Sequence, residues 1–287
     1  MRHIKELWEE IRVNRKAMTG FVILIFFILM AIVGPRVLKL DLTIRFSERY
    51  QMPSWKHILG TDFAGRDTFF QLVYGSQEVL SVGVLTAAFT ILIGFFIGAL
   101  SGLIGKWIDS VIMFITNLFL TIPQFPILIV ISTLIKVSNP LIFSLILSLF
   151  SWGGLARAIR SQILSLKHSE FIIACRIMNL STMHIIFKEI MPNIISYIAI
   201  NFIFIIQSAV NASVGLMMLG LAPYSPTNWG MMISLAVQNT GGIFNPRAYI
   251  YLLSPIVCLA LFQLGCIFFA NGLDEAFNPR IKSQKGA

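Results

Sequence analysis

The sequence predicts an all-α integral membrane protein with about six transmembrane helices. Its 287 residues are 56% apolar and only 12% charged, whereas soluble domains carry about a quarter charged residues. The mean hydropathy is strongly positive, at +0.81. This small number of charged side chains cannot cover a globule of this size in water. Hydrocarbon must therefore be the solvent for much of the surface.

Six uncharged stretches can each cross about 30 Å of hydrocarbon, which takes roughly 20 helical residues. The first stretch follows a basic N-terminal segment, and Gly34-Pro35-Arg36 is a poor cleavage site, so we expect an uncleaved span. The predicted spans are residues 17–35, 79–105, 110–135, 137–156, 194–221 and 248–273.

The connecting segments set the predicted topology. Segments expected inside hold 14 Lys and Arg and those expected outside hold eight, which favours cytoplasmic termini at 1–16 and 274–287. Residues 36–78 form the first outer loop, where Asp67 is expected to start an interfacial helix from Gly65 to Tyr74; an ordinary membrane-surface helix is an equal alternative. Residues 222–247 are too rich in Pro, Asn and Gly to span and are expected to be a second outer loop.

The residues exclude several kinds of chemistry in this chain. A nucleotide-binding P-loop is absent, because at the nearest approach, Gly105-Lys106, Leu100 replaces the first Gly and Trp107 follows the Lys. The four histidines lie outside the spans without metal-ligand spacing, and the three cysteines form no disulfide framework. The sequence therefore predicts no catalytic residue, no metal and no cofactor.

Charge placement also bears on the class of protein. The positive charges lie in short patches between apolar runs, which argues against a nucleic-acid partner and for a lipid bilayer. The span interiors contain no Asp, Glu, Lys or Arg, which ion-coupled carriers usually need at membrane depth. A stand-alone secondary carrier or channel nevertheless remains the alternative reading.

Seven amide side chains lie within the spans, and most are expected to form interhelical hydrogen bonds. A subset could line a water-filled translocation path, for which the candidates are Asn117, Gln124, Asn201, Gln207 and Asn211.

The charged segment between the fourth and fifth spans cannot cross the membrane, yet its first half is apolar on nearly every side. Phe171, Ala174, Cys175 and Met178 form one helical stripe that can pack on the chain's own bundle. Ile173 and Ile177 remain for another surface, and a soluble partner is the natural occupant. The alternative is an amphipathic loop lying on the membrane.

The same segment carries turn and cap signals. Asn179 can close the first helix in a left-handed conformation, and Ser181 can cap a second helix from Thr182 to Met191. Pro192 is expected to end that helix and begin the next span. Two short helices joined by a sharp turn would form a stiff elbow, residues 168–191.

This elbow resembles the coupling-helix motif of ABC-importer permeases, which reads Glu-Ala-Ala, three residues, Gly, and later Leu-Pro. The matching residues are 170–179 (EFIIACRIMN) and 185–193 (IIFKEIMPN). More closely, the chain resembles the second permease subunit of dipeptide, oligopeptide and nickel importers. The supporting segments are 59–67 (LGTDFAGRD), 151–157 (SWGGLAR), 219–221 (LGL), 228–230 (NWG) and 272–280 (GLDEAFNPR).

The resemblance implies a type I ABC-importer fold in a bacterial-type plasma (inner) membrane. It implies three kinds of partner: a second, homologous permease, two cytoplasmic ATPases that bind ATP and Mg, and an external substrate-binding protein. It also implies that the elbow contacts an ATPase, through Glu170, Phe171, Ile173, Ala174, Cys175, Ile177, Asn179, Ser181 and Pro192.

Two positions depart from the motif, because Cys175 stands at its second Ala and Asn179 at its Gly. Both residues are small or tolerate the turn, so we expect the elbow to survive. The substrate is left open between peptides, nickel complexes and oligosaccharides. Residues 122–126 and 201–204 resemble the oligosaccharide branch more.

Overall fold

The structure is a computed structural model that describes residue 9 and residues 11–135, 139–222, 225–240 and 244–277. Most of the two predicted cytoplasmic termini and the start of the predicted fourth span therefore lie outside the described residues.

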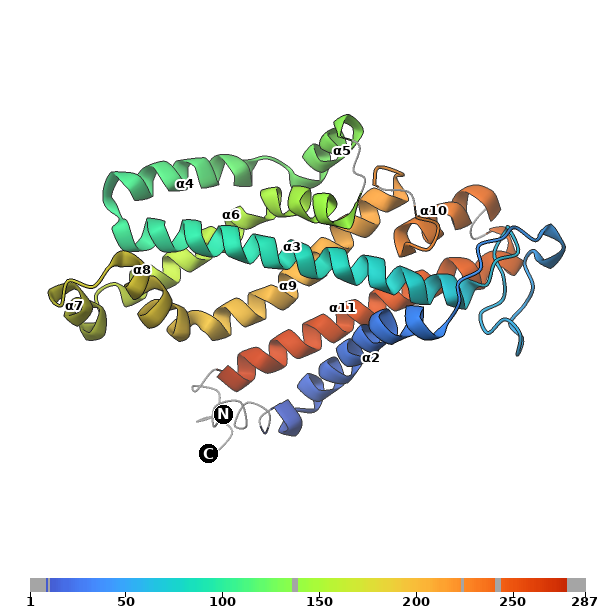
Figure 1. Ribbon diagram of the computed structural model, residues 1–287, viewed down its shortest axis with the longest axis horizontal. Helices are drawn as coiled ribbons and strands as arrows, with labels where there is room; N and C mark the ends of the chain where they lie inside the picture. Colours follow the sequence, from blue (N-terminus) through green and yellow to red (C-terminus); the bar gives the residue numbers. More distant parts are fainter. Residues whose placement is uncertain (1–8, 10, 136–138, 223–224, 241–243, 278–287) are drawn as a thin grey trace.

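The described chain is almost entirely helical (Figure 1). Five helices are long and apolar enough to cross a membrane, or six if α4 and α5 form one bent span. The long helices are α2 (Arg15–Val37), α3 (Thr68–Ile104), α6 (Pro140–Leu166), α9 (Met191–Met218) and α11 (Tyr249–Phe277). The shorter elements are η1 (Phe46–Glu48), α4 (Lys106–Thr121), α5 (Gln124–Leu134), α7 (Glu170–Ile177), α8 (Thr182–His184), η2 (Ile185–Ile190), α10 (Trp229–Thr240) and η4 (Pro246–Ala248).

The second spanning helix, α3, begins at Thr68, earlier than the predicted start of the second span at Val79. Asp67 caps it, accepting a hydrogen bond from the backbone N–H of Phe70 at 3.0 Å. The helix does not stop at Tyr74 but continues as α3 to Ile104. The expected interfacial helix is therefore the first part of a spanning helix, since Gly75 does not interrupt the helical backbone here. A Cβ at Gly75 would lie 2.0 Å from the carbonyl oxygen of Thr227, so a glycine is required there for close packing.

The predicted third span is broken. Residues 110–135 form parts of two helices, α4 and α5, whose axes are bent by 82°. Pro123 restricts the residue before it to an extended conformation, and Ile122 accordingly has ψ 123°. The chain therefore leaves the helix at Thr121 and restarts it at Gln124.

Small residues bring α3 and α6 together along most of their length. Gly94, Gly98 and Gly102 are spaced by one helical turn and face α6; a Cβ at Gly98 would lie 2.4 Å from the carbonyl oxygen of Ala156. In a bilayer such small faces let backbones approach closely, which favours helix association. The pair α2 and α11 uses the same device, because a Cβ at Gly20 would lie 2.4 Å from the backbone nitrogen of Phe269.

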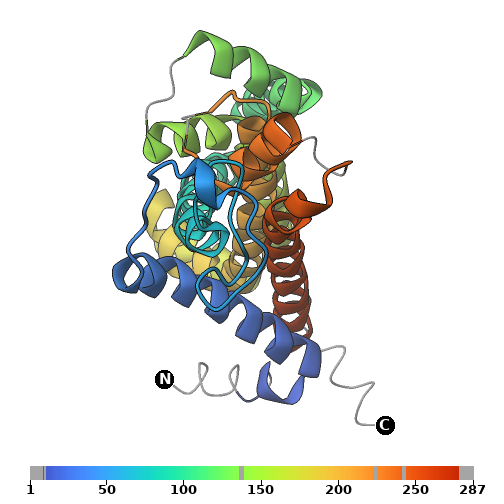
Figure 2. The ribbon, with the colours of Figure 1, turned by 90° about the vertical axis from the view of Figure 1, so that its right-hand side faces the viewer.

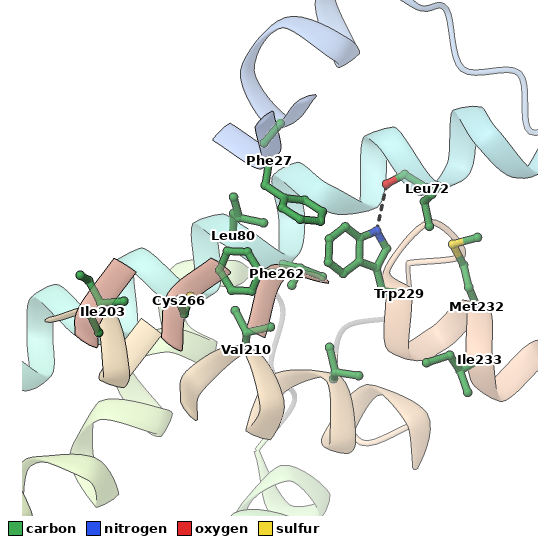
Figure 3. Close-up of a cluster of buried hydrophobic side chains, with 14 of the residues drawn as sticks. Phe27, Leu72, Leu80, Ile203, Val210, Trp229, Met232, Ile233, Phe262 and Cys266 are labelled. Atoms are coloured by element: carbon green, nitrogen blue, oxygen red, sulfur yellow. Dashed lines mark hydrogen bonds between the residues drawn. The ribbon is translucent and has the colours of Figure 1, made fainter. Parts of the chain in front are cut away.

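The second predicted outer loop contains a buried helix. The side chain of Trp229, at the start of α10, is fully buried, and its Nε1 donates to the carbonyl oxygen of Leu72 at 2.9 Å (Figure 3). Its ring packs edge-on against Phe27, with centroids 5.8 Å apart. In the described part of residues 222–247 no helix is long enough to span, as expected, but α10 contributes to the core formed by α2, α3, α9 and α11.

The two ends of the bundle differ (Figure 1). The elbow lies at one end, the same end at which α2 begins and α11 finishes. Residues 38–67, which we call the cap, lie at the opposite end and cross the end of α3 (Figure 2).

The cap is held by buried ionic contacts. Asp62 is fully buried; it accepts from Arg66 Nε at 2.8 Å and from the backbone N–H groups of Ala64 and Arg66. His57 Nδ1 lies 2.8 Å from a carboxylate oxygen of Asp67. At the cap surface, the hydrogen bond from Lys56 holds the pKa of the Glu48 carboxyl below its usual range. These contacts give residues 59–67 a defined shape.

Candidate functional site

The elbow has the sharp turn that the sequence predicts. Asn179 adopts φ +54°, the left-handed conformation. Just beyond it, the backbone N–H of Leu180 donates to the carbonyl oxygen of Cys175 at 3.0 Å, which closes α7 as a helix end of this type does. Ser181 then caps α8 by accepting from the backbone N–H of His184 at 3.2 Å. The predicted turn and cap are confirmed.

The face of α7 that packs on the bundle differs from the predicted stripe. Ile172 and Cys175 are buried, while Phe171 is half-buried. They join Ile185 and Ile186, which follow α8, in one apolar cluster. Ala174 and Met178, expected in the stripe, are exposed. The helix is therefore rotated by about one position relative to the prediction, with Ile172 in place of Ala174 on the packed face.

This rotation divides the expected coupling residues into a buried group and an exposed group. Cys175 is buried and serves internal packing. The exposed side chains include two isoleucines, Ile173 at 46% and Ile177 at 80% exposure, together with Met178 at 62%. Glu170 at the start of α7 is also exposed. An apolar face at the tip of the bundle is thus left open.

Pro192 does not end the second helix, contrary to expectation. Residues 182–218 form one apolar helix that includes α8, η2 and α9. The segment Ile185–Ile190 is a π-helix, in which the N–H of Met191 bonds to the carbonyl oxygen of Ile186. The wider π turn accommodates the proline, which lacks a backbone N–H and crowds the preceding turn of an α-helix. The elbow is consequently joined to α9 without a break.

Two arginines near the elbow end are engaged within the chain. Arg160 binds Asp109 through two hydrogen bonds of 2.5 Å, which fastens α6 to the start of α4. Arg157 Nη2 donates to Asn117 Oδ1 at 2.6 Å. These contacts stiffen the bundle next to the elbow.

The polar residues proposed for a path fall into separate groups. Gln124 donates to Ser151 Oγ at 2.9 Å, between α5 and α6, and Asn201 donates to the carbonyl oxygen of Tyr197 in its own helix. Asn117 takes part in the contact with Arg157. The structure brings together only Gln207 and Asn211 of this set, and it adds Gln263 of α11 to them.

Sequence reasoning missed one polar cluster at the other end of α3. Glu78 accepts hydrogen bonds from Ser225 Oγ at 2.7 Å and Thr227 Oγ1 at 3.1 Å, which ties the segment before α10 to α3. The sequence did hold a signal for this cluster, because the carboxylate of Glu78 directly precedes the long uncharged stretch 79–105. Among the described residues, no group of three His, Cys, Asp or Glu side chains could hold a metal ion.

Comparisons with known proteins agree with this architecture. The family described as the binding-protein-dependent transport system inner membrane component matches residues 67–283. The N-terminal TM domain of oligopeptide transport permease C matches residues 4–53.

Curated relatives match over nearly the whole chain. A dipeptide transport system permease protein of Bacillus subtilis is 30% identical, covering 98% of this chain and 87% of the relative. The corresponding protein of Alkalihalophilus pseudofirmus is 31% identical, over 97% and 90%. An oligopeptide transport system permease protein of Bacillus subtilis is 29% identical, over 96% and 90%.

A solved structure shares the fold. It is a chain of the MetNI methionine ABC transporter in inward-facing conformations, with a TM-score of 0.55 and 18% identity; 72% of this chain and 97% of that chain are covered. Together with the two family matches, these findings show that the chain belongs to the inner-membrane components of binding-protein-dependent transport systems, as a multi-pass permease subunit of an ABC importer.

Proposed function

We propose that this permease forms half of the translocation path of a peptide importer and couples that path to ATP hydrolysis through its elbow. Three of its relatives are described as dipeptide or oligopeptide permeases, which supports a peptide substrate. An oligosaccharide substrate, suggested by residues 122–126 and 201–204, has no such support and is the second candidate.

The observation that carries the coupling proposal is the exposed apolar face of α7. Ile177 is 80% exposed at a point where the other face of the same helix is fully packed. Helix α7 lies outside the helices that could span a membrane, at one end of the bundle, so its open apolar face is stabilised if another protein covers it. An ATPase partner of complementary shape would bury Ile173 and Ile177 and gain about 1.5–3 kcal/mol for each side chain fully buried.

The proposed assembly contains a second, homologous permease, two cytoplasmic ATPases that bind ATP and Mg, and an external substrate-binding protein. In this arrangement the elbow end faces the cytoplasm and the cap faces outward. The start of α2 and the end of α11 lie at the elbow end, which is consistent with cytoplasmic termini. The cap then lies on the side from which the binding protein delivers substrate.

Coupling follows from the continuity of the chain between elbow and span. When ATP closes the ATPases, a displacement of α7 is carried through the turn at Asn179 into the unbroken helix 182–218. Hydrolysis allows the reverse movement. The permease itself contributes a rigid connection and no chemistry.

The test uses the assembled transporter, with Ile177→Asp compared with Ile44→Asp in the cap. Ile44 is 62% exposed, so both substitutions place a charge on an exposed apolar site, at opposite ends of the bundle. We expect Ile177→Asp to abolish ATPase co-purification and ATP-driven uptake of trialanine, because an unpaired charge within a packed contact costs about 3–5 kcal/mol. Ile44→Asp should retain the ATPases.

Two outcomes would contradict the proposal. If Ile177→Asp retains the ATPases and normal uptake, α7 is not the contact. If the wild-type protein transports without ATP and without any ATPase, the chain works as a stand-alone carrier or channel.

A further inference from the structure

Three amide side chains form a chain of hydrogen bonds between α9 and α11, near the middle of both helices. Gln207 Nε2 donates to Gln263 Oε1 at 2.7 Å, and Gln263 Nε2 donates to Asn211 Oδ1. Gln207 and Asn211 lie one turn apart on α9. We call these three residues the amide ladder.

The ladder lies at an open surface of the chain. Asn211 is exposed, and Gln207 and Gln263 are half-buried. Ser208, also exposed, and Asn201, half-buried, lie on the same side of α9, at spacings of three and seven residues along the helix. The open face of α9 is therefore partly polar at membrane depth.

The open face of α2 provides a contrast within the same chain. Between residues 22 and 33 every exposed side chain of α2 is apolar, as expected for contact with lipid: Val22, Ile25, Phe26, Ile28, Leu29, Ile32 and Val33. Polar side chains at membrane depth face protein or a water-filled cavity, because an unpaired amide in hydrocarbon costs several kcal/mol. The polar part of the α9 face, which also holds the exposed Phe204, is consequently expected to face protein or a water-filled cavity.

The ladder also leaves specific hydrogen-bonding groups free. The two hydrogen bonds of the ladder use the side-chain nitrogen of Gln207 and the side-chain oxygen of Asn211. The oxygen of Gln207 and the nitrogen of Asn211 can form a hydrogen bond only with a further group. Among the described residues, no hydrogen bond reaches Gln207 Oε1 or Asn211 Nδ2. The carbonyl oxygen of Gln207 and the NH2 group of Asn211 therefore remain free at the two ends, and exchanging oxygen and nitrogen in all three amides only reverses the order.

We propose that the amide ladder, with Asn201 and Ser208, is a water-exposed site that binds the peptide groups of the substrate as it passes the middle of the membrane. This inference rests on the proposed peptide-import function. A peptide group offers one C=O and one N–H, which complement the free donor and acceptor of the ladder.

The electrostatics of the site suit a substrate of variable side chains. Residues 191–218 and 249–273 contain no Asp, Glu, Lys, Arg or His. A neutral site neither attracts nor repels a charged side chain of the substrate strongly, whereas a fixed charge would favour one sign. Recognition then depends on the backbone that all peptides share.

The experiment measures water access and substrate contact at position 211 in the assembled transporter. In a background with Cys175, Cys258 and Cys266 replaced by Ala, Asn211→Cys and the control Leu29→Cys are treated with a charged, membrane-impermeant methanethiosulfonate. We expect Asn211→Cys alone to react, and trialanine to slow its reaction during ATP turnover. The substitution itself removes one end of the ladder, so trialanine uptake should already fall roughly tenfold before modification, as the loss of a hydrogen-bonding site predicts.

A second measurement keeps the natural cysteines. Asn211→Leu is compared with wild type for inhibition of trialanine uptake by trialanine whose backbone nitrogens are methylated. The binding protein is the same in both, so a reduced preference for the unmethylated peptide in Asn211→Leu reports the permease. If the ladder only stabilised the fold, Asn211→Leu would lower trialanine uptake without changing the relative affinity for the methylated and the unmethylated peptide.

Several outcomes would overturn the inference. They are an unreactive Asn211→Cys, equal reaction of Leu29→Cys, reaction that trialanine does not slow, or an unchanged preference in Asn211→Leu. If instead the wild-type transporter shows no ATP-dependent trialanine uptake, the proposed peptide function fails. Normal wild-type uptake with an unreactive Asn211→Cys overturns only the ladder.

Discussion

Asn179 shows how one residue shapes the elbow. It occupies the left-handed region, φ +54°, which only Gly enters without strain and which Asn tolerates better than most residues. The related motif has Gly at this position, so the departure noted in the sequence preserves the backbone conformation. The turn therefore survives with a different side chain.

We predict that Asn179→Gly retains both transport and ATPase association, whereas Asn179→Val weakens both. A β-branched residue in this conformation costs about 1–2 kcal/mol or more and would shift the end of α7. ATPase co-purification and ATP-driven uptake of trialanine measure the effect. Equal behaviour of the two variants would show that the turn geometry does not matter for coupling.

Residue Cys175 illustrates what a local pattern could not decide. The sequence placed it, with Ala174 and Met178, on the packed side of α7; the structure keeps Cys175 there but exposes the other two. Apolar residues surround α7 on nearly every side, so periodicity alone does not select the buried face. The selection depends on Ile185 and Ile186, which lie later in the chain.

At the scale of elements, the α3–α6 pair depends on glycines spaced four residues apart. Gly98 faces Ala156 with no room for a side chain, since a Cβ would lie 2.4 Å from a backbone oxygen. The backbone cannot move aside as a flexible side chain can. This contact therefore sets the distance between the two helices.

We predict that Gly98→Leu separates α3 from α6 and lowers the stability of the purified permease by about 1–3 kcal/mol or more, the cost of overpacking. Gly154→Leu is the matched control, because no atom lies within 4 Å of a Cβ at Gly154. Thermal unfolding in detergent compares the two. Equal midpoints for both variants would mean that the α3–α6 contact is looser than this structure shows.

The bend between α4 and α5 and the length of α3 show the limits of span prediction. Residues 110–135 are uniformly apolar, so hydropathy treats them as one span, but Pro123 forces the chain out of the helix. Conversely, the sequence analysis ended an interfacial helix at Tyr74 and began a span at Val79, whereas α3 runs through both positions without a boundary. Gly75, between them, gives room for the backbone of Thr227.

At the scale of the whole molecule, the chain joins two distant regions with one rigid element. The elbow lies at one end of the bundle, and the helix that leaves it carries Gln207 and Asn211, two of the three ladder residues. In the proposed mechanism, a displacement of the elbow is transmitted through this helix to the α9 face. A stiff connection is required, because a flexible one would absorb the displacement.

We predict that inserting two glycines after Met191 uncouples the transporter. Glycine lowers helix stability by about 1 kcal/mol each, and the insertion also turns the elbow relative to α9. The ATPases should remain bound and hydrolyse ATP, while trialanine uptake is lost. Insertion of two glycines after Leu42, in a part of the cap without regular secondary structure, is the control. Normal uptake in the Met191 variant would rule out transmission through this helix.

The sequence alone determined the membrane character, the approximate spans, the turn at Asn179 and the cap at Ser181, because these depend on composition and on residues close together in the chain. The tertiary structure decided which face of α7 is buried, that Pro192 lies within a continuous helix, that α10 packs in the core, and that Gln207, Asn211 and Gln263 meet. Each of these depends on contacts between residues distant in sequence, whose energies no local pattern contains.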